Sequence, residues 1–261
     1  MFESNLYDFI VGRSDWDGDF EYVDCTRALS PSGLPGIDYA LNPYGGCEHG
    51  CIYCYGPGVT HSDLSRWRVV RVKRNIPDRL RMEIRNIDGT IGLGTVTDPY
   101  QPAESKFRLS MMCLEILREK GMGVHIHTKS DLVLRDADIL SDMDAVVGMT
   151  ITTVDDRSSL MMEPGAPVPE KRLEALKGLV DRGIDAYALI APTTNLLLDK
   201  EDELLRMISE TGAKMVFHDP LNLRNVDDSV LRRRGIVASP ESRRRLNSMD
   251  GRYGLTVSDT F

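Results

Sequence analysis

Three cysteines stand at a spacing that suits an iron–sulfur cluster. The segment Cys47-Glu-His-Gly-Cys51-Ile-Tyr-Cys54 has the pattern Cx₃Cx₂C and lies in a loop bracketed by glycines. Thiolates are the usual protein ligands of such clusters, and a cubane held by three of them leaves one iron open to a non-protein ligand. The motif therefore predicts a [4Fe–4S] cluster held by Cys47, Cys51 and Cys54, with an open iron that can chelate a small molecule.

A zinc site is the alternative for the same thiols. His49 or His61 would then be the fourth ligand, because tetrahedral Cys₃His sites are common. Zinc motifs more often consist of two separated ligand pairs, so the compact triplet favours the cluster. Cys113 falls within an apolar helical pattern and is predicted to be a small buried hydrophobic residue. A non-enzymatic zinc or iron–sulfur binding or assembly protein remains the rival to an enzyme.

The rest of the chain alternates between strand-like and helix-like segments, and these elements would position the cysteines. Such alternation is typical of parallel α/β structure. The expected strands are Tyr39–Asn42, Thr90–Val96, Gly123–Thr128, Ala145–Ile151, Ala186–Ile190 and Lys214–Phe217. Segments with helical spacing lie between them, at Pro77–Asn86, Glu104–Lys120, Leu132–Met143, Pro169–Arg182 and Lys200–Thr211. Six such units predict an α/β fold of the incomplete (β/α)₆ barrel type, with its chemistry at the strand ends.

One strand carries a row of polar side chains toward that end. His125, His127 and Lys129 share the same parity. If Val124 and Ile126 face the outer helices, these three residues point into the barrel, since side chains alternate along a strand. A lysine at the end of the row can reach a bound carboxylate.

Bulk composition is that of a globular protein, with 261 residues, 41% hydrophobic and 28% charged. We expect an N-terminal leader (1–35), the partial barrel (36–220) and a C-terminal appendage (221–261). No apolar run approaches the length of a membrane span, and five cysteines do not form a secreted disulfide framework, so we predict a cytoplasmic protein with no membrane partner. The net charge of −8 disfavours a protein that coats nucleic acid.

Four ordered motifs resemble those of the spore photoproduct lyase-like group of radical S-adenosylmethionine (SAM) proteins, also called DNA repair photolyase-like. The resemblance covers roughly residues 42–217. The motifs are the cysteine triplet with Tyr53 and Tyr55, Gly94-Thr-Val-Thr-Asp-Pro-Tyr-Gln-Pro-Ala-Glu104, Thr128-Lys129-Ser130 and Glu163-Pro-Gly-Ala-Pro167. The resemblance implies a radical SAM barrel that uses a [4Fe–4S] cluster and SAM, with an external electron donor of the ferredoxin or flavodoxin type.

The resemblance also implies where SAM lies. Lys129 and Thr150 would be near its carboxylate, Thr97 and Asp98 near its amino or ribose groups, and Tyr55 beside its adenosyl part. Tyr53 and Tyr100 are the candidates for a catalytic role.

One position departs from the family pattern. Authentic spore photoproduct lyases return a hydrogen atom to thymine from a cysteine, and Thr95 stands at the corresponding position. An alcohol O–H bond is much stronger than a thiol S–H bond, so Thr95 cannot readily fill that role. We therefore expect an enzyme that cleaves SAM to a 5′-deoxyadenosyl radical and acts on a substrate that the sequence does not identify. Nucleic acid is the first candidate by resemblance, and spore photoproduct repair itself is doubtful.

Overall fold

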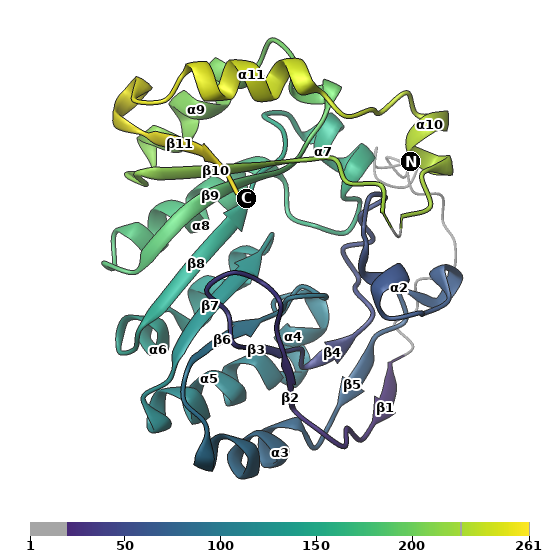
Figure 1. Ribbon diagram of the computed structural model, residues 1–261, viewed down its shortest axis with the longest axis vertical. Helices are drawn as coiled ribbons and strands as arrows, with labels where there is room; N and C mark the ends of the chain where they lie inside the picture. The colour runs from purple at the N-terminus through teal and green to yellow at the C-terminus, as the bar shows by residue number, and fades with distance from the viewer. Residues whose placement is uncertain (1–19, 225, 261) are drawn as a thin grey trace, which may run out of the picture.

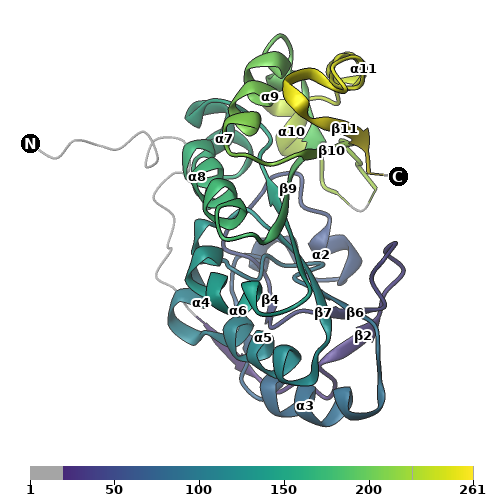
Figure 2. The same ribbon diagram turned by 90° about the vertical axis from the view of Figure 1, so that its left-hand side faces the viewer.

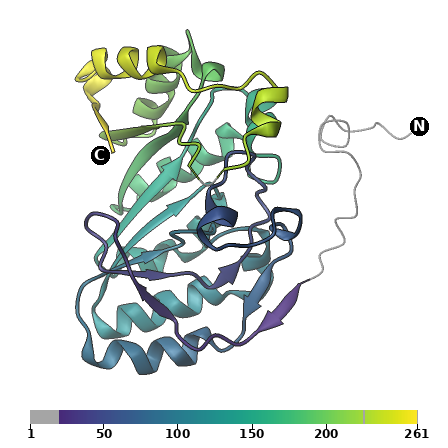
Figure 3. The ribbon, with the colours of Figure 1, turned by 45° about the vertical axis from the view of Figure 1, so that its right-hand side comes forward.

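The computed structural model describes residues 20–224 and 226–260, and its main feature is an open, mostly parallel sheet (Figure 1). The strand order is β11-β10-β9-β8-β7-β6-β3-β2, and only β2 and β3 pair antiparallel. The strands are β2 (Leu29–Pro31), β3 (Tyr39–Leu41), β6 (Thr90–Leu93), β7 (Gly123–Thr128), β8 (Ala145–Thr150), β9 (Asp185–Thr193), β10 (Met215–Pro220) and β11 (Thr256–Asp259). The edge strands β2 and β11 do not meet, so the barrel is incomplete (Figure 3).

All six predicted strands are confirmed, and β11 extends the parallel sheet at one edge. Strand β6 ends three residues before the predicted Val96. Gly94 causes this early end, because its φ is +80° and a Cβ there would lie 2.2 Å from Cδ of Pro99. The chain thus turns away from the sheet directly into the Thr97-Asp98 segment.

A second, small sheet supports the cysteine loop. Its strands are β1 (Glu21–Val23), β5 (Arg71–Lys73) and β4 (Tyr44–Gly45), in the order β1-β5-β4. Strand β4 leads directly into Gly46, whose φ is +79° and whose Cβ would lie 2.5 Å from the carbonyl oxygen of Val69. This close approach of two backbones fixes the point where the cysteine loop begins.

The helices that follow the strands of the main sheet form an outer layer. Figure 2 shows α5, α6 and α8 on one side of the main sheet and α2 on the other. The helices are α2 (Gly56–Val59), α3 (Ile76–Glu83), α4 (Pro102–Phe107), α5 (Leu109–Lys120), α6 (Ala137–Ser141), α7 (Asp156–Met162), α8 (Pro169–Val180), α9 (Glu201–Glu210), α10 (Ser229–Arg233) and α11 (Pro240–Ser248). Short 3₁₀ helices occupy 64–66, 84–86, 131–136, 195–197 and 252–254.

The predicted helix Glu104–Lys120 is two helices, α4 and α5. Arg108 separates them with a left-handed φ of +54°. The carboxylate of Glu104 accepts the backbone N–H of Ser110 at 2.9 Å and so holds the reversed turn. The predicted helix 132–143 likewise consists of the 3₁₀ helix 131–136 followed by α6.

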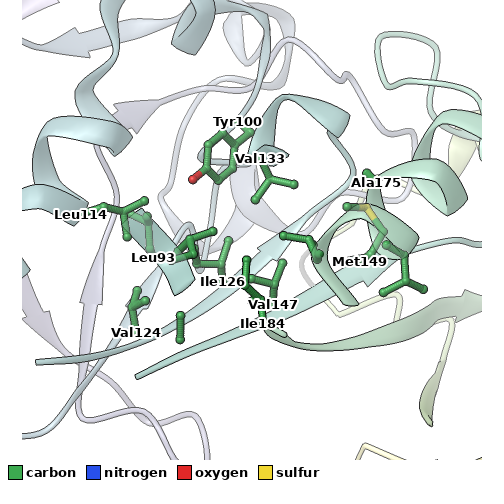
Figure 4. Close-up of a cluster of buried hydrophobic side chains, with 14 of the residues drawn as sticks. Leu93, Tyr100, Leu114, Val124, Ile126, Val133, Val147, Met149, Ala175 and Ile184 are labelled. Carbon is green, nitrogen blue, oxygen red and sulfur yellow. The ribbon is translucent and has the colours of Figure 1, made fainter. Parts of the chain in front are cut away.

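The core lies between the sheet and the outer helices. In β7, buried and half-buried residues alternate, and Val124 and Ile126 pack with Leu114 and Val147 (Figure 4). His125, His127 and Lys129 therefore point to the opposite face, as the alternation predicted; we call it the inner face of the sheet. No helix in the described part of the chain is long and apolar enough to cross a membrane.

Candidate functional site

One cavity at the carboxyl ends of β6 to β9 brings together residues that are far apart in sequence, from Cys47 to Ala191. The predicted cluster ligands and SAM contacts all line it: Cys47, Cys51, Cys54, Tyr55, Thr97, Asp98, Lys129 and Thr150. Tyr53, His49, Thr95 and His127 line it as well. The segments carrying these side chains follow different strands, and parallel strands deliver them to the same edge of the sheet.

Of the two candidate tyrosines, Tyr100 does not line this cavity. Its ring is fully buried in the core, beside Val133 (Figure 4). Its backbone N–H donates to Oδ1 of Asp98 at 2.9 Å, and its ring lies 6.0 Å from the guanidinium carbon of Arg135. Tyr100 therefore sits behind the site, whereas Tyr53 forms part of its wall.

The three thiols lie in one loop and face one cavity. Cys47 is buried, Cys51 and Cys54 are half-buried, and the N–H of Gly56 donates to Sγ of Cys54 at 3.4 Å. No three Cys, His, Asp or Glu side chains within residues 20–224 and 226–260 are placed to share one metal ion. Three thiols in one short loop are the donor set that a [4Fe–4S] cluster with one open iron uses.

Burial keeps these thiols protonated in the metal-free protein. It raises the pKa of Cys51 to about 12, although the nearby Lys129 charge opposes the shift. The pKa of Cys47 is also raised well above its usual range, first by burial and then by the charge of Asp98. Since only the thiolate binds metal, cluster assembly must release protons at this site.

Two of the family-like motifs hold the cysteine loop in place. Gln101 accepts the backbone N–H of Glu48 at 2.9 Å and donates to the carbonyl of Gly46 at 3.2 Å. From the other side, the N–H of Gly165 donates to the carbonyl of His49 at 2.9 Å. A Cβ at Gly165 would lie 2.2 Å from the carbonyl oxygen of Glu48, so only glycine permits this approach. The Glu163–Pro167 motif is thus a support for the cysteine loop.

Asp98 is the electrostatic link between the cysteine loop and β7. Its Oδ1 accepts from Oγ1 of Thr128 at 2.7 Å, and its Oδ2 accepts the backbone N–H of Lys129 at 2.8 Å. Nδ1 of His49 lies 3.3 Å from Oδ2. Burial alone would raise the pKa of Asp98, but attraction to His49 and these hydrogen bonds lower it to about 2. Asp98 is therefore a carboxylate at neutral pH.

Lys129 places a cation at the cavity wall. Its Nζ lies 5.7 Å from the centroid of the Tyr53 ring, within cation–π range. Burial opposes its charge, but attraction to Cys51 in its thiolate form and to Glu163 more than compensates, so the pKa of Lys129 is raised. The lysine therefore remains protonated next to the thiols.

A buried ion pair supports the wall behind Lys129. The phenol of Tyr53 donates to Glu163, and Oε2 of Glu163 lies 2.5 Å from Nη1 of Arg172. Both members of this ion pair are fully buried, and Arg172 also donates to the carbonyl of Thr150 at 3.2 Å. Arg172 could not be identified from the sequence, because its position on α8 resembles that of any other helical arginine.

The remaining predicted contacts surround the mouth of the cavity. The phenol of Tyr55 donates to the carbonyl of Thr95 at 2.6 Å, and 49% of this tyrosine is exposed. Thr97 is buried and donates to the carbonyl of Tyr44 at 3.3 Å. His61, the other candidate zinc ligand, is exposed and lines a separate hollow on the outside of Cys54.

Comparison with known proteins gives one family and one fold. Residues 41–210 match the model of the Radical SAM superfamily. An uncharacterized protein of Methanocaldococcus jannaschii is 35% identical over 184 residues, which cover 69% of each chain. An uncharacterized protein of Mycobacterium tuberculosis is 31% identical over 234 residues, covering 82% of this chain and 68% of the relative.

The fold is similar to that of two solved proteins. A spore photoproduct lyase mutant with bound AdoMet and dinucleoside spore photoproduct gives a TM-score of 0.67 at 15% identity, covering 92% of this chain and 81% of the lyase. Streptococcus suis SuiB bound to S-adenosylmethionine gives 0.53 at 12% identity, covering 87% and 51%. At these identities the likeness concerns the fold alone.

Proposed function

The chain belongs to the radical SAM superfamily of enzymes, and on this premise we propose that Cys47, Cys51 and Cys54 hold a [4Fe–4S] cluster with which the protein cleaves SAM. Enzymes of this superfamily use such a cluster together with SAM. When bound, the cluster supplies the electron that splits SAM into methionine and a 5′-deoxyadenosyl radical. One observation carries the proposal: three thiols and the cation of Lys129 line the same cavity.

The chain's own residues bind and orient SAM in this proposal. Lys129 offers a charged donor to the SAM carboxylate, and Thr150, at the end of the neighbouring strand, offers a hydroxyl. Thr97 and Asp98 stand at the wall for the amino or ribose groups, and Tyr55 at the mouth stands beside the adenosyl part. Because both carboxylate oxygens of Asp98 already have protein partners, we assign Asp98 chiefly to holding Lys129 and the cysteine loop in register.

The observations support the cluster over the zinc alternative. Three thiols in one short loop are the donor set of a cluster with one open iron. His49 faces Asp98, and His61 lies outside the cavity. A Cys₃His zinc site would thus require His49 to leave Asp98 or His61 to enter the cavity.

Anaerobic reconstitution tests the cluster and its chemistry. We expect about four irons per chain, as a cubane requires, and conversion of SAM to 5′-deoxyadenosine once a reductant is added. Single Cys47→Ala, Cys51→Ala and Cys54→Ala variants should lose the iron. Cys25→Ser is the matched control, because Cys25 bonds to Asn75 outside the cavity and its replacement should leave the iron content unchanged. Stoichiometric zinc without iron uptake would contradict the proposal.

We further propose that the electron comes from a one-electron carrier of the ferredoxin or flavodoxin type, and that spore photoproduct repair is not the true reaction. Nucleic acid remains the first candidate for substrate by family resemblance. The cysteines that line the cavity are the three proposed ligands, and Thr95 takes the place of the hydrogen donor. Its hydroxyl accepts from Asn42 at 3.1 Å.

Incubation with SAM, a reductant and dinucleoside spore photoproduct tests this last point. We expect 5′-deoxyadenosine without release of repaired thymines. Chromatography measures the release of thymine. Repeated turnover to intact thymines would show that the enzyme is a spore photoproduct lyase after all.

A further inference from the structure

Two histidines and a tyrosine form a hydrogen-bonded group on the inner face of the sheet. Nε2 of His125 lies 2.8 Å from the phenolic oxygen of Tyr187, and Nε2 of His127 lies 2.5 Å from the same oxygen. A phenol has one proton, so one imidazole nitrogen accepts it while the other, protonated, donates to the oxygen. His127 also lines the cavity of the three cysteines. The group therefore reaches the place where the proposed chemistry occurs.

A glycine allows this group to form. His127, Gly148 and Tyr187 occupy one register row across β7, β8 and β9. A Cβ at Gly148 would lie 2.5 Å from Cδ2 of His127 and 2.7 Å from Cζ of Tyr187. The missing side chain thus lets the two rings meet across the middle strand, and the ring of Phe217, 5.0 Å away, packs on Tyr187 from the next strand.

All three members are neutral near pH 7. Burial lowers the pKa of His127 to about 4, with smaller contributions from His125 and Lys129, and burial also lowers the pKa of His125. Burial raises the pKa of Tyr187. The phenol thus retains its proton, and a neutral imidazole is available to receive it.

The proposed chemistry requires a hydrogen-atom donor at the cavity, and this group can act as one. A carbon radical formed there is quenched when it receives a hydrogen atom, and the thiols that line the cavity are the proposed cluster ligands and do not supply one. A phenolic O–H bond is weaker than the alcohol O–H of Thr95, because the resulting radical is delocalised over the ring. Tyr53 and Tyr55 line the cavity directly, whereas Tyr187 reaches it through His127 and has two imidazole partners on its phenolic oxygen.

We propose that His127 and Tyr187 together return a hydrogen atom to the carbon radical formed in the cavity, and this inference rests on the proposed function. The radical takes a proton from Nδ1 of His127 and an electron from Tyr187. Nε2 of His127 takes the phenolic proton in the same step. One C–H bond forms, one N–H and one O–H bond break, a new N–H bond forms, and a neutral phenoxyl radical remains on Tyr187.

The group is then reset by a reductant and solvent. The phenoxyl radical takes one electron from the same class of one-electron carrier that reduces the cluster. Its proton comes from solvent through His125, which is half-buried and shares the phenolic oxygen. His125 gives its Nε2 proton to the phenolate oxygen and takes a proton from solvent at Nδ1, so a tautomer shift of both imidazoles makes the site ready for another turnover.

A first test uses the metal-free protein and does not depend on turnover. In ¹⁵N NMR spectra of the histidine side chains, we expect one Nε2 to be protonated and the other to be an acceptor. Tyr187→Phe, which keeps the ring packed on Phe217, should shift both signals. Tyr253→Phe, which removes a phenol bonded to Asp202 far along the chain, should shift neither. Unchanged histidine signals in Tyr187→Phe would overturn the hydrogen-bonded group itself.

The second test uses the cluster-loaded protein with SAM as the only probe. In D₂O the phenol and imidazole protons exchange, so the 5′-deoxyadenosyl radical should acquire one deuterium from the group. We expect the deuterium content per 5′-deoxyadenosine to fall severalfold in Tyr187→Phe and in His127→Gln, and to stay at the wild-type level in Tyr253→Phe. A tyrosyl radical signal in rapidly frozen samples should disappear with Tyr187→Phe.

Three other outcomes are each decisive. Unchanged deuterium content in Tyr187→Phe, with no change in the radical signal, overturns the inference and leaves the proposed function standing. Loss of deuterium in Tyr55→Phe in place of Tyr187→Phe assigns the role to the phenol at the cavity mouth and also overturns it. Absence of 5′-deoxyadenosine from the iron-loaded wild type overturns the proposed function and the inference together.

Discussion

The imidazole of His49 and the carboxylate of Asp98 face each other at 3.3 Å, and this contact joins the cysteine loop to the ends of β6 and β7. Asp98 reaches β7 through the backbone N–H of Lys129, so the residues proposed for the cluster and for SAM share one buried carboxylate. A displacement of either segment would disturb the other.

Asp98→Asn should therefore weaken both the fold and the site. The amide keeps the volume but removes the charge that His49 and the N–H of Lys129 bind, which should lower the free energy of unfolding by about 1–3 kcal/mol. Urea unfolding measures this loss, and iron retention during gel filtration should fall with it. Asp88→Asn is the control, because Asp88 is exposed. Equal stability of the two variants would remove Asp98 from its linking role.

Lys129→Ala should reduce SAM affinity while the cluster survives. Loss of a partly desolvated charged hydrogen bond should cost about 2–4 kcal/mol of binding free energy. Equilibrium dialysis with the iron-loaded protein measures the dissociation constant. Lys120→Ala, at the exposed end of α5, should bind SAM like the wild type. If Lys129→Ala binds equally well, the lysine does not contact SAM.

Glu163→Gln should strongly destabilise the protein. The change leaves the fully buried guanidinium of Arg172 without its counter-ion, which should cost about 3–5 kcal/mol in the free energy of unfolding. Denaturant unfolding of the metal-free protein measures the loss without interference from the cluster. The control Glu174→Gln removes an exposed pair with Lys171 and should change stability by less than about 1 kcal/mol. A small effect at Glu163 would show that Arg172 finds another partner.

The free energy of unfolding should decrease as the pH falls from about 6.5 to about 4. The folded-state pKa of His127 is about 4, below its usual value of 6.5, so the unfolded chain binds more protons in this window. His125 acts in the same direction, and the groups facing His127 are His125, Lys129, Asp98 and Tyr187. Asp98 has a pKa of about 2, so the stability that its carboxylate contributes is lost only below this pH range.

His127→Gln should flatten the pH dependence of unfolding between these limits. Urea titrations at several pH values, carried out without metal, provide the measurement. An equally steep dependence in His127→Gln would show that His127 is not held neutral by the fold.

Sequence alone was sufficient for the elements with strong local signals. The six central strands were predictable because each is a short apolar run between turn residues, and Gly121 and Gly183 ended helices with the positive φ that favours glycine. The prediction of elements failed where a long-range contact determined the local structure. Arg108 breaks a continuous helical pattern because the Glu104 side chain binds Ser110, and β11 forms because β10 offers it an edge.

For the site, the spacing of the cysteines and the parity of His125, His127 and Lys129 were properties of the sequence, since chain connectivity and strand alternation fix them. The tertiary structure decided which other side chains join them. It placed Tyr53 at the cavity and Tyr100 in the core, although both were candidates for a catalytic role. It also brought Arg172 to Glu163 and Tyr187 to His127, contacts that depend on strand register and on a glycine in a third strand. No local pattern encodes such contacts, because they exist only once separate segments pack together.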